Sequence, residues 1–343
     1  MRILIVKLSS IGDIVHALPA AAAIRRHLPE ASITWAVDTR YAEILRGSPV
    51  FDDLIELDLR RVNGDSSAEG LAAKLAKQAR GIRKHKFDIA LDLQGLLKSA
   101  TIAKVSGAKR RWGFARPHLR EPASRIFLTD TVRLPEKTHV IRGNLHLASA
   151  ALGFEYDDRV LEFPIAVSPE HIAEADQIAG PIGDRFAILN PGGGWVTKLW
   201  HAEKFGALAD RLHGELGLRP LLVTGPNESD LAARVLAASR SGAIISATPS
   251  LKGLYELARR ASVFVGGDTG PTHIAAAAGA RVVSLFGPTE WWRNGSLSPG
   301  DICVERTEIP CRIDCHRRTC SKWICMDTDV GPVFDAVRLR ISQ

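Results

Sequence analysis

The stretch GGDTGPTHIAAAAG, residues 266–279, places a carboxylate, a hydroxyl and an imidazole within about one turn of an expected helix start. It follows the apolar run ASVFV, which predicts a buried strand, and it enters an alanine-rich segment that predicts a helix. Free N–H groups and the dipole at a helix N-terminus attract anions such as phosphate. We therefore predict an anion-binding site that includes Asp268, Thr269, Gly270 and His273. The alternative is that Asp268 and Thr269 only cap the helix.

Two further loops directly after predicted strands carry suitable groups. In NPGGGWVTK, Gly193 and Gly194 expose backbone N–H groups, and Lys198 adds a mobile positive charge that suits phosphate. In TGPNESD, Glu228 could bind ribose hydroxyls or simply cap a helix. Neither a Walker A loop nor G-x-G-x-x-G is present, which argues against a nicotinamide-dependent oxidoreductase.

The N-terminal segment KLSSIGDIVHALP places Asp13 directly after a glycine turn, at an expected helix start. A carboxylate at the mouth of a cleft can take a proton from an attacking hydroxyl, so we predict a general base. The alternative is a partner for the helix dipole, which would contribute a few tenths to about 1 kcal/mol.

Positive charge is concentrated in the first half of the chain. Residues 1–164 hold 26 Lys or Arg against 19 Asp or Glu, so they carry the entire net charge of +7. This distribution indicates an anionic partner such as nucleic acid, acidic lipid or a charged sugar, unless it is only a solvated face. Nucleic acid is disfavoured because aromatic residues, which would stack on bases, make up only 6% of the chain.

Four of the five cysteines fall in CRIDCHRRTCSKWIC, at Cys311, Cys315, Cys320 and Cys325. The three spacings, C-x3-C, C-x4-C and C-x4-C, fall within the C-x2–4-C range that is typical of zinc sites, and the last two lie at its loose upper limit. We favour a reduced structural loop, with a metal cluster or one or two disulfides as alternatives. No catalytic metal is predicted.

Strand and helix patterns alternate in both halves of the sequence, which predicts an α/β protein with two doubly wound domains facing a cleft. The segment near 155–185 carries acids and prolines without periodicity and is interpreted as a linker. The expected domains are 1–164 and 165–343, and the tail GPVFDAVRLRISQ is expected to close the second domain as one amphipathic helix. No apolar run approaches the roughly 20 residues of a membrane span, and no signal peptide is evident, so a cytoplasmic protein is expected.

The successive motifs VKLSSIGDIVHALPA, DLQGLLKSA, REPASRIF, KLW and GGDTGPTHIAAAAGARVVSLFGPTE together resemble the ADP-heptose:lipopolysaccharide heptosyltransferases, glycosyltransferase family 9. The resemblance covers nearly the whole chain. It implies a GT-B fold and an inverting, metal-independent enzyme without cofactor. The implied reaction moves heptose from ADP-heptose to the Kdo region of the lipopolysaccharide core.

The motifs DLQGLLKSA and REP are most similar to type I enzymes, whereas the cysteine loop is more similar to type II. A type II acceptor, or another nucleotide sugar, therefore stays as the alternative. The resemblance also implies a location at the inner face of the cytoplasmic membrane, in peripheral contact with it, where the anionic precursor Kdo-lipid A would be met.

The resemblance also assigns roles to residues. Asp13 would be the base in an acceptor-binding N-terminal domain. The C-terminal domain would bind the ADP-sugar, with Lys198, Thr269, Gly270 and His273 at the diphosphate and sugar, and Glu228 at the ribose. The acidic acceptor would meet Arg60, Arg61, Lys98, Arg120 and Arg142.

Overall fold

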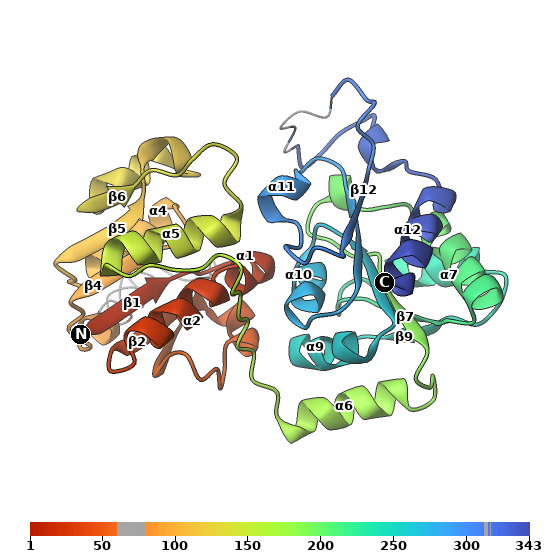
Figure 1. Cartoon of the computed structure of the whole chain (residues 1–343), viewed down its shortest axis with the longest axis horizontal. Helices are drawn as coiled ribbons and strands as arrows, with labels where there is room; N and C mark the ends of the chain where they lie inside the picture. Colours follow the sequence, from red (N-terminus) through yellow and green to blue (C-terminus); the bar gives the residue numbers. More distant parts are fainter. Residues whose placement is uncertain (60–77, 79, 312–314, 316) are drawn as a thin grey trace, which may run out of the picture. The chain divides into compact units, whose positions relative to one another are not determined.

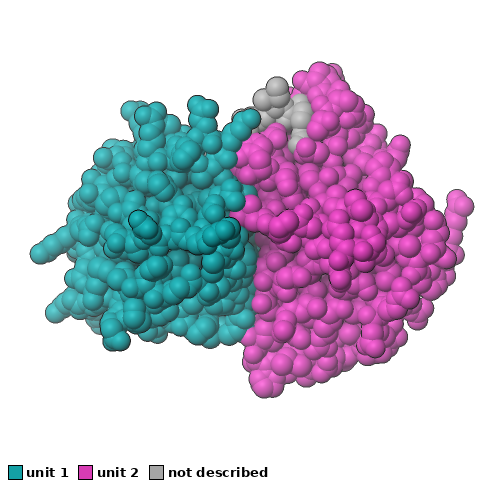
Figure 2. Space-filling view, in the orientation of Figure 1, with its two compact units in different colours: residues 1–166 teal, residues 167–343 magenta. Residues whose placement is uncertain are grey.

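The computed structural model describes residues 1–59, 78, 80–311, 315 and 317–343. Arg60 and Arg61 lie outside the described residues. The chain forms two compact units, Met1–Ala166 and Val167–Gln343, which are coloured separately in Figure 2. Each unit is described by itself below.

Unit 1 is built on a six-stranded sheet in which every pairing is parallel (Figure 1). Its strands, in chain order, are β1 (Arg2–Val6), β2 (Ser32–Asp38), β3 (Asp53–Leu57), β4 (Ile89–Asp92), β5 (Arg110–Phe114) and β6 (Asp130–Val132). The described helices include α1 (Ile11–Val15), α2 (Leu18–His27), α4 (Leu97–Val105) and α5 (Val140–Leu152). The central strand β1 is an Ile/Leu/Val run buried from Ile3 to Val6, as expected for a parallel strand covered on both faces.

Unit 2 repeats this construction with a second all-parallel six-stranded sheet. Its strands are β7 (Phe186–Asn190), β8 (Arg219–Val223), β9 (Ile245–Ala247), β10 (Val263–Gly267), β11 (Val282–Phe286) and β12 (Ile302–Glu305). The described helices include α6 (Pro169–Ala179), α7 (Ala202–Leu216), α8 (Ser229–Ala238), α9 (Leu251–Arg260), α10 (Gly270–Ala277), α11 (Trp291–Asn294) and α12 (Val330–Ser342). As predicted, the C-terminal segment forms a helix, α12, which buries Val333, Phe334 and Val337 in the core of the unit.

The two sheets share one strand order. Unit 1 runs β3-β2-β1-β4-β5-β6, and unit 2 runs β9-β8-β7-β10-β11-β12, which is the same order counted from its own first strand. This is the doubly wound Rossmann order, in which the chain reverses direction across the sheet beside its first strand. Ligands in such sheets bind at the carboxyl ends of the two strands that flank this switch point. The flanking strands are β1 and β4 in unit 1, and β7 and β10 in unit 2.

The interpretation of residues 155–185 as a linker without regular structure is wrong in part, because the segment contains α6. Pro169 suits the first turn of this helix, and Ser168 forms a capping box with His171. Glu174 accepts a 2.8 Å hydrogen bond from the backbone N–H of Ser250, the N-cap residue of α9. The single buried residue Ala175 explains why no apolar periodicity was visible in the sequence.

Candidate functional site

Asp268 is the centre of the site in unit 2. It lies just after β10, is only 4% exposed, and accepts hydrogen bonds with both carboxylate oxygens. Oδ2 is 2.5 Å from Lys198 Nζ and accepts a 2.7 Å bond from Thr289 Oγ1. Oδ1 lies 3.1 Å from His273 Nε2 and accepts a 2.6 Å bond from Asn294 Nδ2. The carboxylate thus joins loops that follow β7, β10 and β11 into one cluster.

This cluster holds Asp268 firmly in its charged form. Burial alone would raise the pKa of the carboxyl group, but the hydrogen bond with His273 and the charge of Lys198 outweigh it and hold the pKa far below its usual range. A buried carboxylate with this set of partners is a rigid scaffold that fixes the positions of a lysine and a histidine.

The glycine loop after β7 packs directly against the loop after β10. A Cβ atom added to Gly193 would lie 3.0 Å from Leu199 Cδ2 and 3.1 Å from Thr269 Cγ2. A Cβ on Gly267 would lie 2.9 Å from the carbonyl oxygen of Lys198. Only small residues therefore allow the two loops to approach this closely, whereas a Cβ on Gly194 would meet open space.

Neither Asp268 nor Thr269 caps α10 with its side chain, so the capping alternative is wrong. Thr269 occupies the N-cap position without a side-chain capping bond, and its Oγ1 lies 3.3 Å from Asn190 Oδ1. Gly270 and Pro271 lie in the first turn of the helix. The N-terminus of α10 therefore keeps backbone N–H groups that no N-cap side chain satisfies, beside Lys198 and Gly193.

Glu228 is the N-cap residue of α8, but its carboxylate makes no capping bond to that helix. Oε2 instead accepts a 2.7 Å bond from the backbone N–H of Gly225. A Cβ on Gly192 would collide with the Glu228 carboxylate. The loops after β7 and β8 are therefore in contact, and Glu228 lies at the same sheet edge as the Asp268 cluster.

In unit 1, Asp13 lies in the first turn of α1, immediately after β1. Its Oδ2 accepts 3.2 Å hydrogen bonds from the backbone N–H and the hydroxyl of Ser10. Arg120 Nη1 is 3.7 Å from the same oxygen, and the Asp13 side chain is 20% exposed. Ser10 and Asp13 form a capping box, so the dipole alternative describes part of the role of this carboxylate.

Two positive charges hold Asp13 in its ionised form. Burial would raise the pKa of this carboxyl group, but the charges of Lys7 and Arg120 and the Ser10 bonds lower it below its usual value. Lys7 is itself buried, and its ammonium donates a 2.6 Å bond to the carbonyl of Leu93. Burial lowers the pKa of Lys7, against the opposing attraction of Asp13.

The predicted acceptor residues separate into two groups. Lys98 lies at the start of α4, with Nζ 3.4 Å from the hydroxyl of Ser9, and Arg120 approaches Asp13 directly. These two residues therefore gather around the loop after β1. Arg142, on α5, is instead paired with Asp158 at 3.0 Å.

Several residues of both clusters were not predicted from the sequence. Gln94, after β4, accepts a 2.6 Å bond from the N–H of Leu8 and donates one of 2.6 Å to the carbonyl of Ser9, which fixes the loop that precedes Asp13. Lys7, Thr289 and Asn294 were missed as well. Lys7 and Gln94 lie within two residues of a strand end, and that position was the signal that could have found them.

The chain is similar to known sugar transferases along most of its length. A family model described as "Glycosyltransferase family 9 (heptosyltransferase)" matches residues 75–324. Lipopolysaccharide heptosyltransferase 1 of Pseudomonas aeruginosa is 29% identical over 321 residues, which cover 94% of this chain and 88% of the relative.

The similarity to solved structures covers both units of the chain. The Escherichia coli heptosyltransferase WaaC with ADP has a TM-score of 0.74 at 24% identity, and the match covers 89% of this chain and 93% of that one. The Escherichia coli ADP-heptose lps heptosyltransferase II has a TM-score of 0.79 at 18% identity, over 100% of this chain and 99% of that one. The predicted fold class, two Rossmann-like domains of the GT-B type, is confirmed.

Proposed function

Because the chain belongs to glycosyltransferase family 9, the heptosyltransferase family, we propose that it transfers heptose from ADP-heptose to the Kdo region of the lipopolysaccharide core. The transfer inverts the anomeric carbon and uses no catalytic metal. The observation that carries the proposal is the Asp268 cluster, which holds a lysine and a histidine beside the N-terminus of α10.

The donor diphosphate binds in unit 2, against the α10 N-terminus and the glycine loop. Lys198 has three N–H donors, of which two reach Asp268, at Oδ2 and at the backbone carbonyl. The third is left for a phosphate oxygen. Gly193, Gly194, Thr269 and Gly270 offer backbone groups to the same ligand. Asp268, as an anion, acts on the diphosphate through Lys198 and His273, while Glu228 binds the ribose.

Lysine and backbone dipoles can replace a metal in this reaction. Departure of ADP leaves negative charge on the β-phosphate, and preorganised N–H donors and an ammonium stabilise that charge. The similar structure of WaaC was solved with ADP, and the other similar Escherichia coli protein is named an ADP-heptose lps heptosyltransferase II, which supports this donor.

Asp13 acts as the general base in unit 1. As the acceptor oxygen attacks the anomeric carbon, its proton passes to the carboxylate, and the bond from the carbon to the diphosphate oxygen breaks. Ser10 donates both of its hydrogen bonds to Oδ2 of Asp13, and Arg120 also lies nearest to that oxygen. We therefore assign the proton to the other carboxylate oxygen, Oδ1. The positive charges of Lys98 and Arg120 suit an acceptor that carries carboxylates.

The acceptor is proposed to be Kdo-lipid A, the substrate of a type I enzyme. The relative from Pseudomonas aeruginosa, named heptosyltransferase 1, supports this choice. No described helix is long and apolar enough to cross a membrane. We also propose that the protein is cytoplasmic and that its basic first half contacts this lipid at the membrane surface.

The function is tested by incubating the purified protein with ADP-heptose and either Kdo-lipid A or its singly heptosylated product. We expect one added heptose on Kdo-lipid A, with equal rate in EDTA. Product only from the heptosylated acceptor would instead establish the type II activity. No product from either acceptor, or loss of activity in EDTA that magnesium restores, would contradict the proposal.

A further inference from the structure

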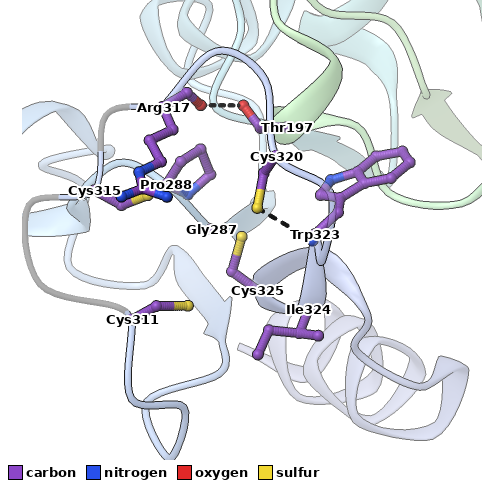
Figure 3. A pocket seen from close by; sticks show the side chains of 10 residues that line it. All are labelled: Thr197, Gly287, Pro288, Cys311, Cys315, Arg317, Cys320, Trp323, Ile324 and Cys325. Atoms are coloured by element: carbon purple, nitrogen blue, oxygen red, sulfur yellow. Dashed lines mark hydrogen bonds between the residues drawn. The ribbon is translucent and has the colours of Figure 1, made fainter.

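Four of the five cysteines line one cavity in unit 2, outside the residues assigned to the substrates. Figure 3 shows Cys311, Cys315, Cys320 and Cys325 arranged around this cavity. The remaining wall comes from Thr197, Gly287, Pro288, Arg317, Trp323 and Ile324. All four thiols are free, and Cys311 and Cys320 are exposed while the other two are half-buried.

The backbone is shaped to bring sulfur atoms into this space. Gly287, directly after β11, faces the short 3-10 turn Ile324–Met326, and a Cβ there would lie 3.1 Å from Cys325 Sγ. Cys320 Sγ accepts a hydrogen bond from the backbone N–H of Trp323 at 3.4 Å. Hydrogen bonds from the surrounding protein to ligand atoms are a regular feature of metal sites, where they orient the ligands.

We propose that Cys311, Cys315, Cys320 and Cys325 bind one thiophilic metal ion, zinc or ferrous iron, in a structural tetrathiolate site. Four thiolates complete the tetrahedral shell that these ions prefer and leave no open position for catalysis. Binding converts each thiol to a thiolate and releases its proton to solvent. Within the described residues, no three side chains already have ligand spacing, so the ion must draw the thiols closer together.

The metal would stabilise the loop that carries Lys198. Thr197 Oγ1 donates a 2.6 Å hydrogen bond to the carbonyl of Arg317, which lies between Cys315 and Cys320. The ring of Trp195 is covered by Lys198 Nζ at 4.5 Å and by the Arg318 guanidinium at 5.1 Å. Residues 317 and 318, which lie between Cys315 and Cys320, are therefore in direct contact with the glycine loop after β7, and fixing them in place restricts that loop.

Metal analysis of the protein as purified without chelator tests the proposal. We expect about one zinc or iron ion per chain, the number that four thiolates hold, and its loss in Cys320→Ser and in Cys325→Ser. Cys303→Ser is the matched control, since Cys303 lies in β12 and does not line the cavity, and it should retain the ion. Absence of metal from the wild type, or equal loss in the control, would overturn the site.

A titration of the unaltered protein avoids the question of whether variants fold. A mercurial reagent added in steps should release the ion in proportion to the thiols modified, as read by a metal-binding dye. Cobalt loaded in its place should show the sulfur-to-metal absorption of thiolate coordination. Rapid modification of four thiols without metal release would contradict the proposal. Neither readout uses substrate, so the outcome is independent of the proposed heptosyl transfer.

Discussion

The two switch points have the same topology and opposite electrostatic arrangements. In unit 2 a buried carboxylate, Asp268, places a cation where an anionic ligand would bind. In unit 1 two cations, Lys7 and Arg120, hold a partly exposed carboxylate, Asp13, in its charged form. The same strand order therefore carries a lysine held by a buried carboxylate in one unit and a carboxylate flanked by cations in the other, and we propose that the first binds an anion and the second acts as a base. Fold alone would not have distinguished them.

The largest effect is expected from Asp13→Asn. The amide keeps the size of the side chain but cannot take a proton, so turnover should fall by at least about a hundredfold. Initial rates with saturating ADP-heptose and Kdo-lipid A measure this. Asp52→Asn is the control, because Asp52 pairs with Arg25, at the opposite end of β2 from the proposed site. Near wild-type turnover in Asp13→Asn would contradict the assignment of Asp13 as the general base.

Lys198→Met should weaken ADP binding by about ten- to a hundredfold, the range expected for a lost charge-assisted hydrogen bond of about 1.5–3 kcal/mol. Calorimetric titration with ADP measures the change. Lys204→Met is the matched control, since that lysine pairs with Asp327 rather than Asp268. Unchanged affinity in Lys198→Met would place the diphosphate elsewhere.

Acid should destabilise the wild type more than Asp268→Asn. The pKa of Asp268 is depressed in the folded state, so its stabilising contribution is present above the unfolded value of about 3.9 and is lost as the pH falls below it. The melting temperatures of the wild type and of Asp268→Asn, measured by thermal unfolding between about pH 6 and pH 3, should therefore converge toward low pH. Melting temperatures that differ by a constant amount throughout would contradict this assignment.

The smallest effect is expected from Arg120→Gln. Its guanidinium is half-exposed and 3.7 Å from Asp13, so its loss should raise the KM for Kdo-lipid A by a few-fold, in keeping with up to about 1 kcal/mol for an exposed ion pair. Arg142→Gln is the comparison variant. Because Arg142 is paired with Asp158 and not with Asp13, its replacement should change the KM for Kdo-lipid A less than Arg120→Gln does. Equal effects of both changes would show that the acceptor site extends to α5.

The sequence predicted the alternation of strands and helices and the loops that carry Asp13, Lys198 and Asp268, because short apolar runs followed by glycine are strong local signals. It did not predict that Asp268 would hold Lys198. That pairing joins residues 70 positions apart and depends on β7 and β10 being neighbours. Lys7 was also missed: its position at a strand end signals that it lies near the site, but the sequence does not show that its ammonium would be buried against the carbonyl of Leu93. The helix α6 was missed because it has almost no apolar face.

The central claim, that unit 2 binds the nucleotide while unit 1 supplies the base, is tested most directly by titrating ADP into Asp13→Asn in a calorimeter. Asp13→Asn is expected to bind ADP with the affinity of the wild type, because every group assigned to the diphosphate belongs to unit 2. A loss of affinity as large as that of Lys198→Met would contradict the division between the two units.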